Sequence, residues 1–354
     1  NSSFINTKSM NEGGVIYSRS YVSVIDSTFI NASANGSGGA IYGLGDVAVV
    51  NSSFINTKSM NEGGVIYSNK NVSVIASKFA NITANNAKYI YSKYCVTLLG
   101  NDYDGKTNCT NDDVVCKQLF ILDGTFTEIQ YRINHTSVNG VLNLVNNKYT
   151  AIDGDNTINV NKNITINGNG AILDADNRFR TMIIGSGVTV SLNNLTFING
   201  NATGDEDDGR GGAIYVSTTV NSKLTVYNSN FTNNSATVDG GAIFLESNFD
   251  GNVVDNCNFN SNKVESGGGA IYIGRYITDG SFNISNSNFT NNQAGWGGAF
   301  CSCMRATVTN CTFTRNQAVS SEGGAIGAFN QGNLKVINST FNSNIGHDGG
   351  AVYS

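Results

Sequence analysis

The chain has 354 residues, of which 40% are hydrophobic, enough to bury a core in one large or two medium domains. Charged residues make up only 13%, and Asn, Ser and Thr take their place, alongside 41 glycines and no proline. The net charge of −5 offers no basic field for phosphate backbones, so we expect no nucleic-acid partner. No apolar run approaches the roughly 18 to 20 residues of a membrane helix, so we expect no membrane span in this segment.

A repeat dominates the chain. Residues 1–18, NSSFINTKSMNEGGVIYS, recur unchanged at 51–68, and a divergent copy, DSTFINASANGSGGAIYG, fills 26–43, which gives a period of 25 residues. Looser copies follow further along the chain. Phenylalanines separated by 24 to 34 residues mark them, namely Phe197, Phe231, Phe259, Phe289, Phe313 and Phe341.

Each copy predicts the same local structure. The alternation in Val22-Ser-Val24 is typical of a strand with one buried face, and an Asn bend, an inward Phe and a polar loop of variable length follow it. Two glycines then allow a left-handed or closely packed backbone before the next strand, Ala-Ile-Tyr. No segment shows sustained helical periodicity, so we expect few helices.

Repeats this short cannot bury their apolar face alone, so neighbouring copies must stack. We expect an all-β fold, a right-handed parallel β-helix, with each strand bonded to its equivalent one rung away at about 4.8 Å. Leucine-rich repeats and propellers are disfavoured because Leu is scarce and the period is too short. Equivalent residues should form columns: an internal stack of Phe4, Phe29, Phe54 and Phe79, and an asparagine ladder at a bend from Asn1, Asn51, Asn256, Asn286, Asn310 and Asn338.

The signature divides the chain into three parts. Residues 1–94 hold regular rungs, residues 95–118 are a polar stretch with three cysteines expected as a linker or side loop, and residues 119–354 form a second β-helix segment. The first strands of that segment, including 120–133, lack the double glycine and are expected to cap an otherwise open rung. One continuous solenoid from which Cys95–Lys117 bulges is the alternative.

A family resemblance rests on two motifs. GGAI begins at Gly38, Gly211, Gly240, Gly268 and Gly323, and FxxN begins at Phe231, Phe259, Phe289, Phe313 and Phe341. The pairing resembles the polymorphic outer-membrane proteins, a bacterial autotransporter adhesin family. The chain is even more similar to the adhesin-like proteins of methanogenic archaea. Their pectin-lyase-like modules open with a run like NITINGNGAILDAD, which begins here at Asn163.

The resemblance covers everything except Cys95–Lys117. It implies a large secreted protein of the cell wall that contacts other cells or surfaces, and it transfers no catalytic residues. The main rival is a polysaccharide lyase or hydrolase, since β-helices often carry that chemistry and fold alone does not decide function. Such enzymes need grouped carboxylates, whereas no NTD, GHG or RIK-type motif occurs and His135 and His347 lie in different regions. We expect no enzymatic activity.

One acidic loop is a candidate calcium site. Asp205, Glu206, Asp207 and Asp208 are consecutive carboxylates of the kind that Ca²⁺ prefers, although they lack the alternate spacing of a dedicated calcium loop. A solvated charge run is the alternative. A structural ion pair is another, since Asp174, Asp176, Arg178 and Arg180 lie one rung earlier and could approach the loop. No other cofactor is expected.

The seven cysteines leave several pairings open. Cys109 with Cys116, or Cys95 with either, could form a disulfide in an oxidising place, and free buried thiols are the alternative. Cys257 and Cys311 occupy the same rung position two rungs apart, too far for a disulfide. Two further cysteines, Cys301 and Cys303, should point to the same strand face.

Two further sets bear on a surface role. Tyrosines after the GGAI motif should face outward, as a stripe for stacking on sugars or as a structural ladder packed by loops: Tyr17, Tyr42, Tyr67, Tyr215 and Tyr272. Asn-x-Ser/Thr sequons are candidates for glycosylation where they face outward: Asn31, Asn81, Asn134, Asn163, Asn194, Asn230, Asn288 and Asn310.

Together these features predict a non-enzymatic, extracellular β-helix, a stiff rod of the cell surface or cell wall that presents loops to other cells or glycans. Both ends of the sequence are solenoid rungs with exposed strand edges, so end-to-end self-association into an architectural filament is the alternative.

Overall fold

A computed structural model of the chain describes residues 2–106, 112–145, 147–216, 222–245, 250–274, 281–329 and 333–354. The chain divides into two compact units, Asn1–Asp123 and Gly124–Ser354, called unit 1 and unit 2 below. Each unit is a solenoid whose strands pair in parallel with the equivalent strands of neighbouring rungs. The parallel β-helix expected from the repeat is therefore confirmed.

A full rung contributes strands to four sheets, which we name by their sequence signatures. The Val sheet holds the alternating Val-Ser-Val strands, and the Phe sheet holds the strands centred on phenylalanine. The Gly-Gly sheet holds the strands that follow the two glycines. Two-residue strands between the Phe and Gly-Gly strands form the short sheet.

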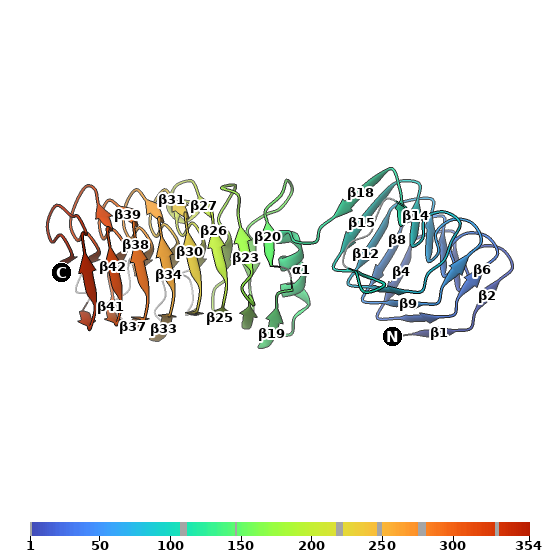
Figure 1. The fold of residues 1–354 in the computed structure, drawn as a ribbon, viewed down its shortest axis with the longest axis horizontal. Coiled ribbons are helices and arrows are strands. Elements are labelled where there is room, and N and C mark those ends of the chain that lie inside the picture. The colour runs from blue at the N-terminus through green and yellow to red at the C-terminus, as the bar shows by residue number, and fades with distance from the viewer. Residues whose placement is uncertain are drawn as a thin grey trace. The chain divides into compact units, whose positions relative to one another are not determined.

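Among the described residues, unit 1 has five strands in each of its three main sheets (Figure 1). Its Val sheet consists of β4 (Val22–Ile25), β8 (Val47–Val50), β12 (Val72–Ile75), β15 (Cys95–Leu99) and β18 (Gln118–Ile121). Its Phe sheet consists of β1 (Ser3–Ile5), β5 (Thr28–Ile30), β9 (Ser53–Ile55), β13 (Lys78–Ala80) and β16 (Asp102–Tyr103). Its Gly-Gly sheet consists of β3 (Ile16–Ser18), β7 (Ile41–Gly43), β11 (Ile66–Ser68), β14 (Ile90–Ser92) and β17 (Val114–Val115). Its short sheet consists of β2 (Lys8–Ser9), β6 (Ser33–Ala34) and β10 (Lys58–Ser59).

Unit 2 has eight strands in each main sheet of its described residues. Its Val sheet consists of β19 (Gly140–Asn143), β22 (Ile164–Asn167), β25 (Thr189–Asn193), β29 (Lys223–Tyr227), β33 (Asp250–Asp255), β37 (Ser281–Ser285), β41 (Arg305–Thr309) and β45 (Leu334–Ile337). Its Phe sheet consists of β20 (Lys148–Thr150), β23 (Ile172–Asp174), β26 (Thr196–Ile198), β30 (Asn230–Thr232), β34 (Asn258–Asn260), β38 (Asn288–Thr290), β42 (Thr312–Thr314) and β46 (Thr340–Asn342). Its Gly-Gly sheet consists of β21 (Ile158–Val160), β24 (Met182–Ile184), β28 (Ile214–Val216), β32 (Ile243–Leu245), β36 (Ile271–Ile273), β40 (Phe300–Ser302), β44 (Ile326–Ala328) and β47 (Val352–Tyr353). Its short sheet consists of β27 (Asn201–Ala202), β31 (Ser235–Ala236), β35 (Lys263–Val264), β39 (Gln293–Ala294) and β43 (Gln317–Ala318).

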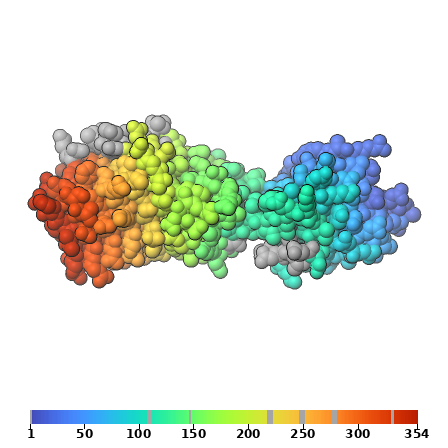
Figure 2. Space-filling view, turned by 90° about the horizontal axis from the view of Figure 1, so that it is seen from above, coloured from blue at the N-terminus to red at the C-terminus, as the bar shows by residue number. Residues whose placement is uncertain are grey.

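Phenylalanine rings stack through the interior of both units, as the repeat predicts. In unit 1 the ring centroids from Phe4 to Phe79 lie 4.7 to 5.4 Å apart. In unit 2 the six rings from Phe197 to Phe341 lie 4.7 to 4.9 Å apart. The register sets Phe opposite Phe in adjacent strands, so each rung packs on its neighbours. In Figure 2 the colours of unit 2 accordingly follow one another in chain order along its surface.

Two left-handed corners flank the Phe strand of each regular rung. Asn256 and Ser261, five residues apart, have φ of 52° and 56°, and the same pair recurs from 194/199 to 338/343. Asparagine tolerates this conformation better than most residues, which explains why it recurs at the bends. The corner amides bond along the column, as in the 2.7 Å bond from Asn256 Nδ2 to Asn228 Oδ1. The expected asparagine ladder is confirmed in part: Asn256 and Asn310 donate to the corner asparagine of the preceding rung, whereas Asn51 donates to Asp26 and Asn286 to Asp255. Asn1 lies outside the described residues.

A second asparagine column lies inside unit 2, just after the second corner. The buried Asn262 donates from Nδ2 to Asn292 Oδ1 and to the Phe231 carbonyl, both at 3.0 Å. Its Oδ1 accepts from the backbone N and the Nδ2 of Asn234, at 3.1 and 2.9 Å. Both amide hydrogens and two acceptor positions are thus used, and this inward residue is the Asn of the FxxN motif.

The two glycines of the motif meet different requirements. Gly240 has a φ of +66°, in the left-handed region. A Cβ on Gly241 would lie 2.1 Å from the carbonyl oxygen of Gly269 in the next rung. The first position therefore favours glycine for its left-handed backbone conformation. The second needs glycine because the next rung leaves no room for a Cβ. Ala87, with a φ of 53°, takes the first position where AKYIYS replaces the motif.

The segment 95–118 differs from the linker or side loop expected there, because its described residues continue the solenoid of unit 1. Strand β15 pairs with β12 and β18, β16 pairs with β13, and β17 pairs with β14. Val96, Leu98 and Tyr103 face the core. Parallel pairing uses backbone groups and needs only inward apolar residues, so a rung persists after its repeat signature is lost. The division between the units follows Asp123.

The strand expected over 120–133 is wrong in its second half, which is the helix α1 (Phe126–His135). Thr125 Oγ1 accepts from the Glu128 N–H at 3.3 Å, and Glu128 Oε2 accepts from the Gly124 N–H at 2.7 Å, in the manner of a capping box. The apolar residues Phe126, Ile129 and Ile133 share one helix face and join the core of unit 2. The cap expected at the start of this segment is thus a helix rather than a strand.

Candidate binding surfaces

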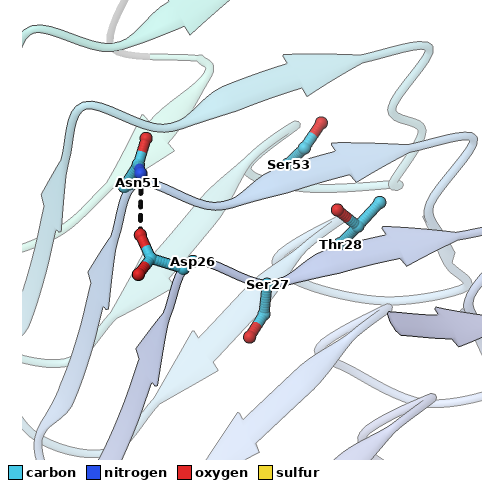
Figure 3. Close-up of a pocket in the computed structure, with 5 residues that line it drawn as sticks. All are labelled: Asp26, Ser27, Thr28, Asn51 and Ser53. Atoms are coloured by element: carbon cyan, nitrogen blue, oxygen red, sulfur yellow. Dashed lines mark hydrogen bonds between the residues drawn. The ribbon is translucent and has the colours of Figure 1, made fainter. Parts of the chain in front are cut away.

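A shallow pocket lies at the corner between the Val and Phe sheets of unit 1 (Figure 3). Asp26 and Asn51 occupy the left-handed corner in successive rungs, and Asn51 Nδ2 donates to Asp26 Oδ1 at 2.7 Å. Thr28 and Ser53 lie on the adjacent strands β5 and β9, whereas Ser27 is buried in the wall. The pocket thus presents a carboxylate, an amide and two hydroxyls, groups that hydrogen-bond polar ligands.

The tyrosine column of unit 1 is a stack of rings. The centroids of Tyr17 and Tyr42 lie 5.3 Å apart, those of Tyr42 and Tyr67 4.6 Å, and those of Tyr67 and Tyr91 5.1 Å, with nearly parallel planes. Burial raises the pKa of Tyr42 and of Tyr67. A sugar stacks on a free ring face, and here each inner ring has both faces covered by its neighbours.

The same column in unit 2 is buried. Tyr215 and Tyr272 are 6% and 4% exposed and form a second apolar layer with Phe244, Cys301 and Cys303. Burial raises the pKa of the Tyr272 hydroxyl, which lies 3.4 Å from Cys303 Sγ. Alternation therefore turns these rings outward in both units, and packing covers them in unit 2, whereas Tyr17 at the end of the unit 1 stack is 53% exposed.

Two buried arginines complete this outer layer. The guanidinium of Arg180 lies 4.8 Å from the ring centroid of Tyr215, and that of Arg210 lies 5.0 Å from that of Phe244. Arg180 Nε donates to the carbonyl oxygen of Arg210 at 2.8 Å, and its Nη2 donates to that of Asp207 at 2.5 Å. Burial lowers the pKa of Arg180. Of the two arginines expected near the acidic loop, Arg180 reaches it through main-chain carbonyls, whereas Arg178 pairs with Asp153 and Asp176.

The acidic loop forms the 3₁₀ turn η1 (Glu206–Gly209). Its Asp207 Oδ1 accepts from Arg210 Nη1 at 2.6 Å, and the carboxylates of Asp205, Glu206 and Asp208 are exposed. Nowhere in the described part of the chain do three or more acidic, His or Cys side chains gather to hold a metal ion. The four carboxylates of the loop therefore do not converge on one point.

Most candidate sequons take part in outward ladders. The Nδ2 atoms donate to the preceding rung from Asn31 (2.7 Å), Asn81 (3.1 Å), Asn230 (3.2 Å), Asn288 (2.9 Å) and Asn310 (3.2 Å). Asn194 is exposed at a left-handed corner. In the remaining two, the side-chain oxygen accepts a bond: Asn134 from Gln130 Nε2 at 3.0 Å and Asn163 from the Thr189 N–H at 2.8 Å. All eight lie at least partly on the surface.

Of the described cysteines, Cys95, Cys116, Cys257, Cys301 and Cys311 are free thiols. Cys95 and Cys116 are half-buried in unit 1, and burial raises the pKa of Cys116. Cys109 lies outside the described residues. Cys257 and Cys311 are buried, each with its Sγ 3.2 Å from the carbonyl oxygen two residues earlier, at the position that serine fills in other rungs.

The histidines lie apart from one another and from the carboxylates of the acidic loop. His135 ends α1 and stacks on Tyr131 with centroids 3.9 Å apart, and the exposed His347 lies 3.6 Å from Asp348. Among the described residues, the helices are all too short or too polar to span a membrane.

The outer face of the Phe sheet in unit 2 is a regular polar array that inspection of single motifs missed. In six successive rungs the residues before the phenylalanine are Thr196, Asn230, Asn258, Asn288, Thr312 and Thr340. The residues after it are Ile198, Thr232, Asn260, Thr290, Thr314 and Asn342. All are half-buried or exposed, and the signal for them is the pair of residues that flank each repeated phenylalanine.

The Chlamydia polymorphic membrane protein repeat matches residues 228–246 and 256–274. Each matched stretch begins at a corner asparagine and includes a Phe strand, the double glycine and a Gly-Gly strand. No curated protein sequence matches the chain. Two rungs of unit 2 are therefore similar to this membrane protein repeat, and the match suggests an outer-membrane or surface location.

Proposed function

We propose that this chain is a non-enzymatic part of an exported surface protein, a stiff β-helix that contacts other cells or glycans. The match to the polymorphic membrane protein repeat is the observation that carries the proposal. The motif resemblance to the adhesin-like proteins of methanogenic archaea supports the same role. Within this proposal the chain is extracellular, at the cell surface or in the cell wall.

The internal columns support a role as a stiff rod. Stacked phenylalanines and the buried amide ladder repeat in rung after rung of unit 2, so bending or slipping a rung would break several contacts at once. A binding surface on such a scaffold keeps its geometry when the ligand is absent.

The placement of ionisable groups supports the non-enzymatic part. Asp207 is paired with Arg210, and the two histidines lie in separate places. A glycosidase needs two facing carboxyl groups at a defined separation. The exposed carboxylates of the acidic loop stand on one short turn.

The outward sequons support an exported glycoprotein. Of the eight candidates, Asn134, Asn163 and Asn194 are the best acceptors, because their Nδ2 atoms, unlike those of the ladder asparagines, donate none of the bonds described above. Modification of the ladder asparagines would crowd rungs that lie about 4.8 Å apart. Peptide mass spectrometry of the native protein tests this order of occupancy.

The proposed function is tested on intact cells. Immunogold labelling and protease shaving should find the protein at the surface, and antibody fragments against it should reduce attachment to partner cells or glycan-coated beads. Recovery of the protein only from the cell interior would contradict the proposal. Release of reducing or unsaturated sugars from polysaccharides by the purified chain would contradict its non-enzymatic part, and ordered end-to-end arrays in micrographs would favour the architectural filament.

A further inference from the structure

We propose that the outer face of the Phe sheet in unit 2 binds a neutral polysaccharide chain. The inference rests on the proposed surface function and names both the contact surface and the class of its ligand. The face consists of four columns in six rungs: the residues before and after each phenylalanine, and the left-handed corner residues at 194/199, 228/233, 256/261, 286/291, 310/315 and 338/343.

The face is flat and uninterrupted. Its two corners are always five residues apart, so no insertion arches over the strand between them. The variation in rung length falls elsewhere, for example between β36 and β37 (seven residues) and between β40 and β41 (two residues). At about 4.8 Å per rung, six rungs offer a track of roughly 24 Å, the length of several sugar units.

The face is almost free of charge. Of its 24 positions, Arg315 alone carries a formal charge, and the others are amides and hydroxyls except for Ile198. An anionic polymer would need a row of cations, and a cationic one would need carboxylates. A protein partner would need buried aromatic or apolar anchors, which this face does not offer.

The hydrogen-bonding groups suit a polyhydroxyl ligand. Asn258 Nδ2 donates to Asn230 Oδ1 at 2.8 Å, and Asn258 Oδ1 accepts from Asn288 Nδ2 at 2.9 Å. Each such ladder amide uses one N–H and one lone pair, leaving one of each for a ligand. Sugar hydroxyls both donate and accept, so they match a surface that offers donor and acceptor at every rung.

The face is also ordered before any ligand binds. The phenylalanine stack and the inner amide ladder lie directly behind it and fix the spacing of the rungs. The ladder bonds fix the amide orientations on the outside. Binding therefore orders few side chains, which lowers its entropic cost.

Unit 1 has the same corners and the same phenylalanine stack, but a different outer face. The residues after its phenylalanines include Ile30 and Ile55, and the residues before include Lys78, which lies 3.5 Å from Asp102. The polar, uncharged array is therefore a property of unit 2 and not a requirement of the fold.

The experiment uses the full chain and two triple variants from the same three rungs. The face variant is Thr232→Lys, Thr290→Lys and Thr314→Lys, and the matched control is Thr225→Lys, Asn283→Lys and Thr307→Lys on the outer side of the Val sheet. Affinity electrophoresis measures retention by a neutral β-glucan, a neutral mannan and a neutral galactan, with polygalacturonate as the anionic probe. Circular dichroism checks that each variant is folded.

We expect the native chain and the control to be retained by at least one neutral polysaccharide, and the face variant to lose at least tenfold in affinity. Equal retention of the two variants would overturn the inference, as would no retention of the native chain on any neutral polymer or a preference for polygalacturonate. None of these results touches the surface labelling that tests the proposed function. If the lysine variant does not fold, Thr→Val at the same three positions keeps strand propensity and should still weaken retention.

Discussion

The two units share one scaffold and differ in the column just inside the second corner. In unit 2 this column is the amide ladder through Asn234, Asn262 and Asn292, with Nδ2 to Oδ1 distances of 2.9 and 3.0 Å. In unit 1 the same column begins Thr7, Ala32, Thr57 and Ile82, and the hydroxyls of Thr7 and Thr57 have no hydrogen-bond partner among the described residues. The fold therefore tolerates either a complete polar ladder or a mixed column.

The comparison separates what specifies the fold from what strengthens it. The phenylalanine stack, the left-handed corners and the close glycine contact occur in both units. The amide ladder occurs in one. We infer that the shared features define the rung, and that the ladder adds stability to unit 2, because fully satisfied buried networks stabilise whereas partly satisfied ones do not.

The largest effect should come from the shared phenylalanine stack. Phe54→Ala in unit 1 and Phe259→Ala in unit 2 each remove a fully buried ring, and each should cost about 3–5 kcal/mol of unfolding free energy. Urea titration followed by circular dichroism measures both. A much smaller cost in one unit would show that its rungs are held together by something other than the stack.

The next effect should distinguish the units. Asn262→Ala removes the donor to the Phe231 carbonyl and the Oδ1 that accepts from the backbone N–H and from Nδ2 of Asn234, and should cost about 2–3 kcal/mol. Thr57→Ala, the matched change in unit 1, removes a hydroxyl that has no hydrogen-bond partner among the described residues, and it should change stability by less than about 1 kcal/mol. Equal costs at the two positions would refute a stabilising role for the ladder.

A smaller effect is expected at the corners. Ala76 and Arg315 occupy left-handed positions, with φ of 48° and 53°, where most rungs carry asparagine. Ala76→Asn and Arg315→Asn should each stabilise the protein, by about 0.5–1 kcal/mol, because asparagine adopts this conformation at lower cost. The midpoint of thermal unfolding should rise in both variants. An unchanged midpoint would mean that the corner conformation is set by the sheets on either side, whatever residue occupies it.

The shared features are also those that the sequence predicts. The residues of one column recur at similar spacing along the sequence. The phenylalanines, corner asparagines and glycines of one rung therefore predict the positions of those in the next. The rung over residues 95–118 was missed because backbone pairing persists without these residues, with Tyr103 in place of phenylalanine and with Gly100 and Gly105 at the corners. The helix α1 was missed because its capping signal, Thr125 with Glu128, lies beside a run that also fits a strand.

The candidate site was harder to predict than the fold. Alternation gives the direction of a side chain and not what covers it, so the tyrosines face outward as expected but stack on one another or lie under Arg180 and Phe244. The arginine layer depends on the path of a loop across two rungs, which no spacing in the sequence specifies. The polar face of unit 2 was visible in the residues beside each phenylalanine, but its flatness followed only from the constant corner geometry.

The smallest change in stability at neutral pH is expected in the column of residues that directly follows the first corner. In unit 1 it holds Ser27, Ser52 and Ser77, whereas unit 2 has a thiol at Cys257, whose pKa burial raises to about 12. The folded protein therefore keeps this proton to higher pH than the unfolded chain does, so the stability it contributes is present below about pH 9 and is lost as the pH rises toward 12.

Cys257→Ser places a group that does not titrate at a position where serine already works in other rungs, so its urea midpoint should match the native one at pH 7 and exceed it at pH 11. An equal alkaline loss in native and variant protein would assign the loss to other groups. A gain confined to unit 2 would show that one substitution in a shared column gives the two solenoids different responses to pH.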